Sequence, residues 1–114
     1  MGRVVDGYKE FVERANKSDA AKGLMAGWDR IVQFIIDGED DFYLKVEGGQ
    51  VSLTVGVHES PSVTLKGPEE VMYKMLTGEL DATRAYFAKQ YTIQGSMSDA
   101  MKFGRIGTAL VKGQ

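Results

Sequence analysis

The chain has 114 residues, 43% hydrophobic and 26% charged, and we expect it to fold as one globular domain spanning residues 1–114. Its 14 basic residues are scattered and its net charge is -2, which disfavours a nucleic-acid partner. The chain has no cysteine, which excludes disulfides and thiolate chemistry and is typical of a reducing compartment, so we expect a cytoplasmic protein. Its longest apolar runs are far shorter than the roughly 20 residues that span a bilayer, and no secretion signal is expected.

The first third of the chain predicts two helices and then a strand. Apolar residues recur at helical spacing from Val4 to Ala15, with charged residues on the other face. Ser18 is a suitable N-cap for a short second helix over residues 19–24. Between Trp28 and Ile36 β-branched and aromatic residues dominate, which favours a strand.

The middle of the chain predicts a hairpin. Residues 42–47 and 51–55 alternate between apolar and polar side chains, which is the pattern of strands with one buried face. Gly48 and Gly49 provide the positive φ angles that a tight turn between them requires. Residues 28–55 are therefore expected to form a three-stranded antiparallel meander.

The second half predicts short elements separated by clear boundaries. Val63 and Leu65 indicate a strand ending at Gly67-Pro68, with Pro68 in the first turn of the next helix. Gly78 is suited to end that helix in a left-handed conformation. Asp81 is suited to cap a further helix, which carries Ala85 and Phe87.

A short strand and a final helix complete the predicted order. The strand contains Tyr91 and Ile93, and Ser96 with Asp99 resembles a capping box for the helix that follows. The periodicity predicts a polar side for this helix with Ser98, Lys102 and Arg105. It assigns to the broad buried face Met97, Ala100, Met101, Gly104, Ile106 and Leu110.

The order of these elements and two sequence segments resemble the sterol carrier protein-2 domain. The segments are IVQFII at residues 31–36 and MLTGELDATRAYFAKQYTIQGSMSDAMKF at residues 75–103. The resemblance covers roughly residues 18–110 and is most specific over residues 76–103. It implies an α+β fold with a five-stranded, largely antiparallel sheet covered on one face by helices. It also implies an apolar tunnel between these layers that binds fatty acids, fatty acyl-coenzyme A or sterols.

The side chains expected to face this tunnel define the candidate site. From the sheet they are Phe34, Ile36, Leu44, Leu53 and Val55, and from the helices Met72, Met75, Leu76, Phe87, Met97, Met101 and Ile106. The four methionines suit a wall that must adapt to chains of varied shape, because methionine is flexible and polarizable. Alternatively, they fill gaps in an ordinary core. Lys102 or Arg105 could meet a charged head group, or could simply be solvated.

The residues give little support to an enzyme, and we expect neither a cofactor nor a metal site. His58 is the single histidine and is expected on the surface, although it would be the sole candidate general base near neutral pH. The acidic run Glu39, Asp40 and Asp41 matches no calcium loop and is expected to be a solvated turn. The segment 104–107 lies within a helical pattern and lacks the features of a phosphate loop.

The outer face of the sheet and the end of the chain complete the sequence-based expectations. Ile31 and Ile35 fall on the face opposite Phe34, so they are either isolated exposed side chains or a patch covered by a second copy or another domain. The last three residues, Lys112, Gly113 and Gln114, do not match a peroxisomal targeting tripeptide, which agrees with the cytoplasmic expectation.

Three functions remain open at this point. The first is a lipid carrier. The second is an accessory module that presents lipid-like substrates to a separate enzyme, since related domains occur attached to alkylsulfatases. The third is a dimeric interaction module with a packed, ligand-free core.

Overall fold

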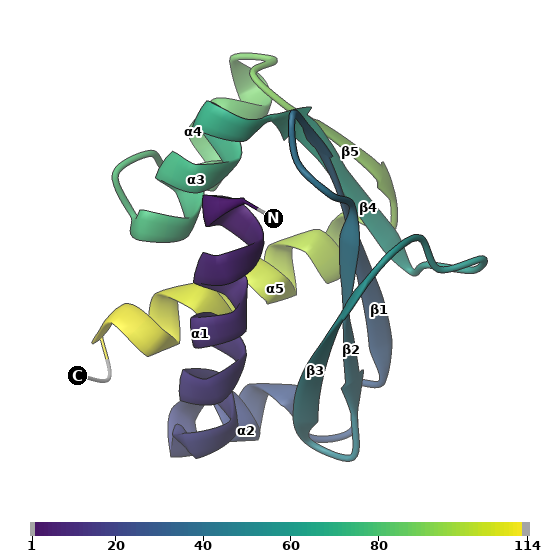
Figure 1. Ribbon diagram of the computed structural model, residues 1–114. Helices are drawn as coiled ribbons and strands as arrows, with labels where there is room; N and C mark the ends of the chain where they lie inside the picture. Colours follow the sequence, from purple (N-terminus) through teal and green to yellow (C-terminus); the bar gives the residue numbers. More distant parts are fainter. Residues whose placement is uncertain (1, 113–114) are drawn as a thin grey trace.

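A computed structural model describes residues 2–112 and the side chains up to residue 110 (Figure 1). Gly113 and Gln114, which end the chain, lie outside the described residues. The elements in chain order are α1 (Arg3–Lys17), α2 (Asp19–Met25), β1 (Arg30–Asp37), β2 (Phe42–Glu47), β3 (Gln50–Val55), β4 (Val63–Pro68), α3 (Glu69–Thr77), α4 (Ala82–Phe87), β5 (Thr92–Gly95) and α5 (Met97–Lys112). Every element that the sequence predicts is present.

The five strands form one mixed sheet in the order β3-β2-β1-β4-β5. β1, β2 and β3 are antiparallel neighbours, which confirms the predicted meander. Gly48 and Gly49 occupy the turn with φ angles of 63° and 79°. β4 runs parallel to β1, and β5 is antiparallel to β4, so the sheet is largely antiparallel as expected.

The helices cover one face of this sheet (Figure 1). The buried face of β1 and β2 presents Val32, Phe34, Phe42 and Leu44, each fully buried. α1 packs over this face through Val4, Val5, Tyr8 and Ala15. The fold is therefore an α+β arrangement of two layers with the core between them.

Several predicted caps are confirmed. The Ser18 hydroxyl accepts the Ala21 N–H at 3.2 Å, and the Asp81 carboxylate accepts the Thr83 N–H at 2.8 Å. Gly78 ends α3 in the left-handed conformation with a φ angle of 83°. The Ser96 hydroxyl accepts the Asp99 N–H at 3.2 Å.

Two predictions about boundaries and caps need correction. Pro68 lies at the end of β4 and forms the N-cap of α3, whereas the sequence placed it inside the helix. Its alignment with Asp37 in the parallel β1–β4 pair continues the extended backbone through this position. The Asp99 carboxylate does not complete the capping box, because it binds Trp28 and Arg30 instead.

The outer face of the sheet is less open than the sequence suggests. Gln33, in the middle of β1, is 1% exposed and uses its side-chain amide to accept the His58 N–H at 2.7 Å and to donate to Gly56 and Phe42 carbonyls. These bonds hold the loop after β3 against the outer face. Ile31 and Ile35 are half-buried on either side of the buried Gln33, so they are not the isolated exposed side chains that the sequence allowed.

Within residues 2–112, no helix combines the length and the apolar character needed to cross a bilayer.

Candidate functional site

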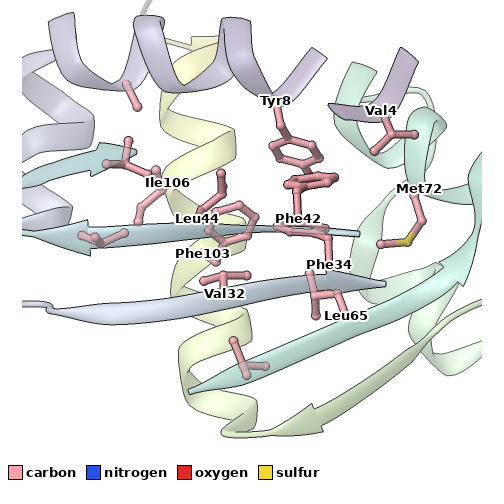
Figure 2. Packing of buried hydrophobic residues seen from close by; sticks show 14 of the residues in the cluster. Val4, Tyr8, Val32, Phe34, Phe42, Leu44, Leu65, Met72, Phe103 and Ile106 are labelled. Atoms are coloured by element: carbon pink, nitrogen blue, oxygen red, sulfur yellow. The ribbon is translucent and has the colours of Figure 1, made fainter. Parts of the chain in front are cut away.

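An aromatic cluster occupies the space between α1, α5 and the sheet. Figure 2 shows Tyr8 pointing from α1 towards Phe34 and Phe42, with Phe103 of α5 beside them. The Tyr8 ring centroid lies 4.6 Å from that of Phe34 and 5.6 Å from that of Phe42. Phe34 and Phe42 are stacked at 4.7 Å with an interplanar angle of 10°. The Phe103 centroid lies 5.8 Å from that of Phe34.

This cluster is strongly apolar in character. Burial raises the pKa of the Tyr8 phenol above its ordinary value of 10.0, because the phenolate would lose its hydration there. The buried polar side chains among the described residues are Gln33 and Asp99, and both have hydrogen-bond partners. The space between the layers is thus filled mainly by apolar side chains, among which a charged group would be costly.

Eight of the twelve predicted site residues are buried or half-buried. Phe34, Ile36, Leu44, Met72 and Ile106 are buried, and Leu53, Met75 and Leu76 are half-buried against the core. Both the sheet and the helices contribute side chains to this set of eight, as the sequence predicts. Whether these side chains contact a ligand stays a prediction.

The other four predicted site residues are exposed, which corrects the expectation that they face the core. Val55 is 54% exposed, Phe87 76%, Met97 40% and Met101 58%. Val55 ends the edge strand β3, and Phe87 ends the six-residue helix α4. Both residues are thus the last of their element, and their side chains are exposed there.

The two methionines are exposed because α5 is rotated relative to the predicted orientation. Its buried residues are Asp99, Phe103, Ile106 and Leu110, which recur at helical spacing on one face. Met97 and Met101 lie on the opposite face, together with the exposed Gly104. The prediction failed because a nearly continuous apolar pattern gave two possible inward faces. Phe103 fills the aromatic cluster, and Asp99 fixes the start of the helix.

Asp99 connects α5 to the beginning of the sheet. Its carboxylate accepts hydrogen bonds from the Trp28 indole N–H at 3.2 Å and from Arg30 Nε at 3.0 Å. Lys102 lies one turn along, with its ammonium 5.7 Å from the centre of the Trp28 ring. Lys102 therefore has a structural partner, whereas the Arg105 side chain is exposed.

The acidic run holds the start of α1 and is not merely a solvated turn. The Glu39 carboxylate accepts the backbone N–H groups of Val4 at 3.2 Å and Val5 at 3.3 Å, where the helix begins. Asp41 accepts the Ile36 N–H at 3.3 Å. No three histidine, aspartate or glutamate side chains within the described residues are arranged to hold a metal ion.

His58 also has a structural role. Its Nδ1 atom accepts the Ser60 N–H at 3.0 Å, and its ring packs edge-on against Tyr43 with a centroid distance of 5.0 Å. It is half-buried, so the prediction of a surface histidine holds only in part. The segment 104–107 lies within α5, as its helical pattern predicts.

Two surface depressions differ in character from the interlayer space. One, of about 470 Å³, is lined by Lys9, Glu10, Glu13, Arg14 and Lys17 on the outer side of α1. The other, of about 210 Å³, is lined by Lys45, Glu47, Gln50, Val51 and Ser52 at the β2–β3 hairpin. Both carry charges of each sign, and neither involves a predicted site residue.

Sequence reasoning missed three of the residues in the aromatic cluster, whereas it predicted Phe34. Tyr8 and Phe42 were assigned to buried faces but not to the site, and Phe103 was not assigned to the core. The available signal was the spacing of Phe103 from Ile106 and Leu110, which matches one helical face.

Comparisons with known proteins agree on this architecture. Residues 9–107 match the family model described as the SCP-2 sterol transfer family. A solution structure of the sterol carrier protein domain 2 of Helicoverpa armigera has a TM-score of 0.76 at 24% identity, covering 96% of this chain and 89% of that chain. The solution structure of palmitated SCP2L2 from Aedes aegypti has a TM-score of 0.59 at 20% identity, covering 84% and 93%.

A larger enzyme contains a similar domain. The stereoselective inverting sec-alkylsulfatase Pisa1 from a Pseudomonas species has a TM-score of 0.64 at 19% identity, and the match covers 76% of this chain. It covers 14% of the sulfatase, so this chain corresponds to a small part of that protein. No curated protein matches the chain with significance.

Proposed function

The chain belongs to the SCP-2 sterol transfer family, and on this premise we propose that it carries a fatty acid, fatty acyl-coenzyme A or sterol-like molecule between its helices and its sheet. The family match over residues 9–107 is the observation that carries the proposal, because it includes both layers. Family membership supports lipid binding or transfer in general. The choice of ligand and the site residues are our proposal.

The proposed site consists of the buried and half-buried members of the predicted set together with the aromatic cluster. Tyr8, Phe42 and Phe103 join the eight predicted residues that are buried or half-buried. An apolar chain in this layer would contact carbon atoms from α1, α3, α5 and the sheet. A charged head group would remain outside, because ionised groups are costly in such surroundings.

An acyl chain can bind here without a charged clamp. Burying ~16 methylenes at ~0.8 kcal/mol each provides ~13 kcal/mol, against an association cost of ~4 to 15 kcal/mol, which is compatible with micromolar affinity. The aromatic side chains pack against one another in the layer between the helices and the sheet. We therefore expect Tyr8 and Phe103 to change position when a ligand enters, with α1 or α5 moving outward.

Two alternatives remain. The alkylsulfatase likeness favours an accessory module that presents a lipid-like substrate to a separate enzyme. A filled aromatic layer would also suit an interaction module without a ligand, and its dimerisation through Ile31 and Ile35 stays a prediction. None of these functions requires a catalytic group, and we propose a cytoplasmic, non-enzymatic role.

A direct test is to extract the purified protein with organic solvent and to examine it by native mass spectrometry. We expect a co-purified fatty acid or sterol, with saturable displacement of a fluorescent fatty acid. A protein that purifies without lipid and displaces no probe would contradict the carrier proposal and favour the ligand-free module. Sedimentation of a monomer at high concentration would in turn exclude the homodimer.

A pair of matched substitutions tests the position of the site. Met75→Arg introduces a charge at a half-buried position of α3, and we expect it to weaken probe binding at least ~10-fold because the charge is poorly solvated. Met101→Arg introduces the same charge at an exposed position of α5 and should leave binding within about twofold. Far-UV circular dichroism and thermal unfolding establish that both variants are folded. Equal losses in the two variants would show that the ligand lies elsewhere.

A further inference from the structure

The outer edge of β3 has backbone groups directed away from the sheet. β3 is the outermost strand on one side of the order β3-β2-β1-β4-β5 (Figure 1). In an antiparallel pair, alternate residues direct their N–H and C=O groups to the neighbouring strand, and the residues between them direct theirs outwards. The Gly56 N–H binds the Asp41 carbonyl at 2.8 Å, which places Gly56 among the residues that bind towards β2. The residues of β3 that direct their backbone groups outwards are therefore Val51, Leu53 and Val55.

The first of these three residues already has a partner. The Asn16 side chain donates to the Val51 carbonyl and accepts the Val51 N–H, both at 2.8 Å. Within residues 2–112, no hydrogen bond reaches the outward backbone groups of Leu53 and Val55. The N–H and C=O groups of these two residues are thus free to pair with another strand.

The side chains of this edge do not oppose such pairing. Residues 51–57 include no charged residue, and Thr54, Val55 and Val57 are exposed. Native sheets usually protect a free edge with charged side chains, proline, a bend or a short strand. β5, at the opposite edge, has only four residues and ends at Gly95, whose φ angle of 96° departs from extended backbone. The β3 edge has none of these protections beyond Asn16.

A second copy of the same edge is complementary to it. If two β3 strands pair antiparallel about a two-fold axis at Thr54, Leu53 of each copy lies opposite Val55 of the other, and all the free backbone groups are satisfied. An axis at Leu53 would set Val55 opposite Val51, whose groups are bound by Asn16. An axis at Val55 would set Leu53 opposite Val57, which lies beyond the end of the strand.

We propose that the chain forms a two-fold dimer in which the β3 edges of two copies pair with Thr54 at the axis. The two sheets then become one continuous sheet. The two Thr54 side chains meet on its outer face, and each Val55 is covered by Leu53 of the other copy. No like charges are brought together at the junction, because the paired segment has none. The inference goes beyond lipid binding and does not depend on it.

Sedimentation equilibrium over a range of concentrations tests the association itself. A short ladder buries less than the ~1,200 Å² typical of a stable interface, so we expect a weak dimer with a dissociation constant of about 100 μM. A protein that stays monomeric at ~1 mM would overturn the proposal and leave the edge to a strand of a different protein.

Amide hydrogen exchange measured by NMR locates the contact. Raising the protein concentration to ~1 mM should slow exchange at Leu53 and Val55 about fivefold, because their N–H groups become bonded in the dimer. Exchange at Thr54, which is bonded to β2 in each copy, should change less. A dimer in which Leu53 and Val55 exchange at the monomer rate would overturn the proposal, because another surface would then form the contact.

Charge substitution at the axis tests the register. Thr54→Lys and Thr54→Glu each set like charges opposite one another, and each should weaken dimerisation at least ~10-fold at low ionic strength. An equal mixture of the two variants should associate about as well as the wild type, since opposite charges then meet. Two weakened variants that fail to associate with each other would contradict the axis at Thr54.

Matched controls use the opposite edge of the sheet. Gln94→Lys and Gln94→Glu place the same charges at an exposed position of β5, and both should associate like the wild type. Losses equal to those of the Thr54 variants would overturn the proposal. Thermal unfolding establishes that all four variants are folded, as expected for exposed positions.

The fate of this proposal is separable from that of the carrier function. Thr54 and Gln94 are exposed on the face of the sheet opposite the helices, outside the proposed lipid site. Displacement of a fluorescent fatty acid should therefore be the same in the wild type and in all four variants. A wild type that dimerises as described but displaces no probe would contradict the carrier function alone.

Discussion

At the scale of single residues, Tyr8 is the residue of α1 that places an ionisable phenol in the buried interior. The residue is 6% exposed, and its ring lies beside four phenylalanine rings, those of Phe11 and Phe103 in the helical layer and those of Phe34 and Phe42 in the sheet. Because burial disfavours the phenolate, the folded state binds the phenol proton more tightly than the unfolded state does. A group whose pKa is raised on folding stabilises the folded state below its unfolded pKa, and this contribution is lost as the pH rises above that value.

The free energy of unfolding should therefore fall as the pH rises above 10.0, the ordinary value for tyrosine. Tyr8 alone accounts for a slope of about 1.4 kcal/mol per pH unit in that range. Tyr8→Phe should remove that part of the slope, as measured by denaturant titrations at about pH 9 and about pH 11. A smaller slope should remain from Tyr91, whose pKa is also raised by burial. An unchanged slope in Tyr8→Phe would contradict the position given to this side chain.

At the scale of elements, side chains at helix ends and faces fix how the helices are placed. Glu39 holds the beginning of α1, while Asn16 near its end donates to and accepts from the Val51 backbone at 2.8 Å. This pair of bonds also satisfies part of the free edge of β3. Arg3 pairs with Glu69 at the start of α3, and its hydrogen bond lowers the pKa of that carboxyl.

Gly7 sets the approach of α1 to α3. A Cβ atom at this position would lie 2.1 Å from the Leu76 Cδ2 atom, so the side chain of Leu76 occupies the space above the glycine. Such close contact explains a glycine within a helix, where it otherwise lowers helix stability. The sequence offered no reason to single out this position.

A double-mutant cycle tests this contact. Gly7→Ala should destabilise the wild type by ~1 to 2 kcal/mol, because overpacking exceeds the gain in helix propensity. In a Leu76→Ala background the same substitution should stabilise the protein by up to ~1 kcal/mol, since the space is free. Gly104→Ala is the control, because a Cβ atom at that position would meet no packed neighbour within 4 Å, and it should be stabilising in either background. The same sign for Gly7→Ala in both backgrounds would contradict this prediction and show that the half-buried Leu76 side chain rotates away from the added methyl group.

At the scale of the whole molecule, two layers enclose one core and leave the outer face of α5 uncovered. The rotation of α5 directs Phe103 and Ile106 to the sheet and leaves Met101 in solvent. The two faces of the last helix therefore differ. One contributes Phe103 and Ile106 to the proposed lipid site, and the other is exposed.

The rotation predicts unequal effects of truncation along one helix. Phe103→Ala should lower the free energy of unfolding by ~3 to 5 kcal/mol, because it removes a ring from the aromatic cluster. Met101→Ala should change it by no more than ~0.5 kcal/mol. Urea unfolding monitored by far-UV circular dichroism measures both values. A larger loss of unfolding free energy in Met101→Ala than in Phe103→Ala would instead favour the helix orientation expected from the sequence, with Met101 buried.

The sequence by itself determined the identity and order of the elements. Alternation in β2, the glycine pair in the hairpin, Gly78 after α3 and the caps Ser18 and Asp81 are local signals, and each is confirmed. The family resemblance added the pairing of these elements into a sheet covered by helices. The local signals depend on neighbours within a few residues. The pairing of the elements depends on the arrangement of the whole chain, which the family resemblance implied.

Tertiary structure alone decided which side chains face the interior where the pattern allows more than one answer. In α5, apolar residues occur on most of the surface, so the contacts of Phe103 and Asp99 with distant residues select the buried face. Gln33 and Glu39 likewise obtain their roles from backbone groups more than twenty residues away in sequence. A helical pattern specifies an amphipathic element, but its rotation is fixed by the partners that pack against it.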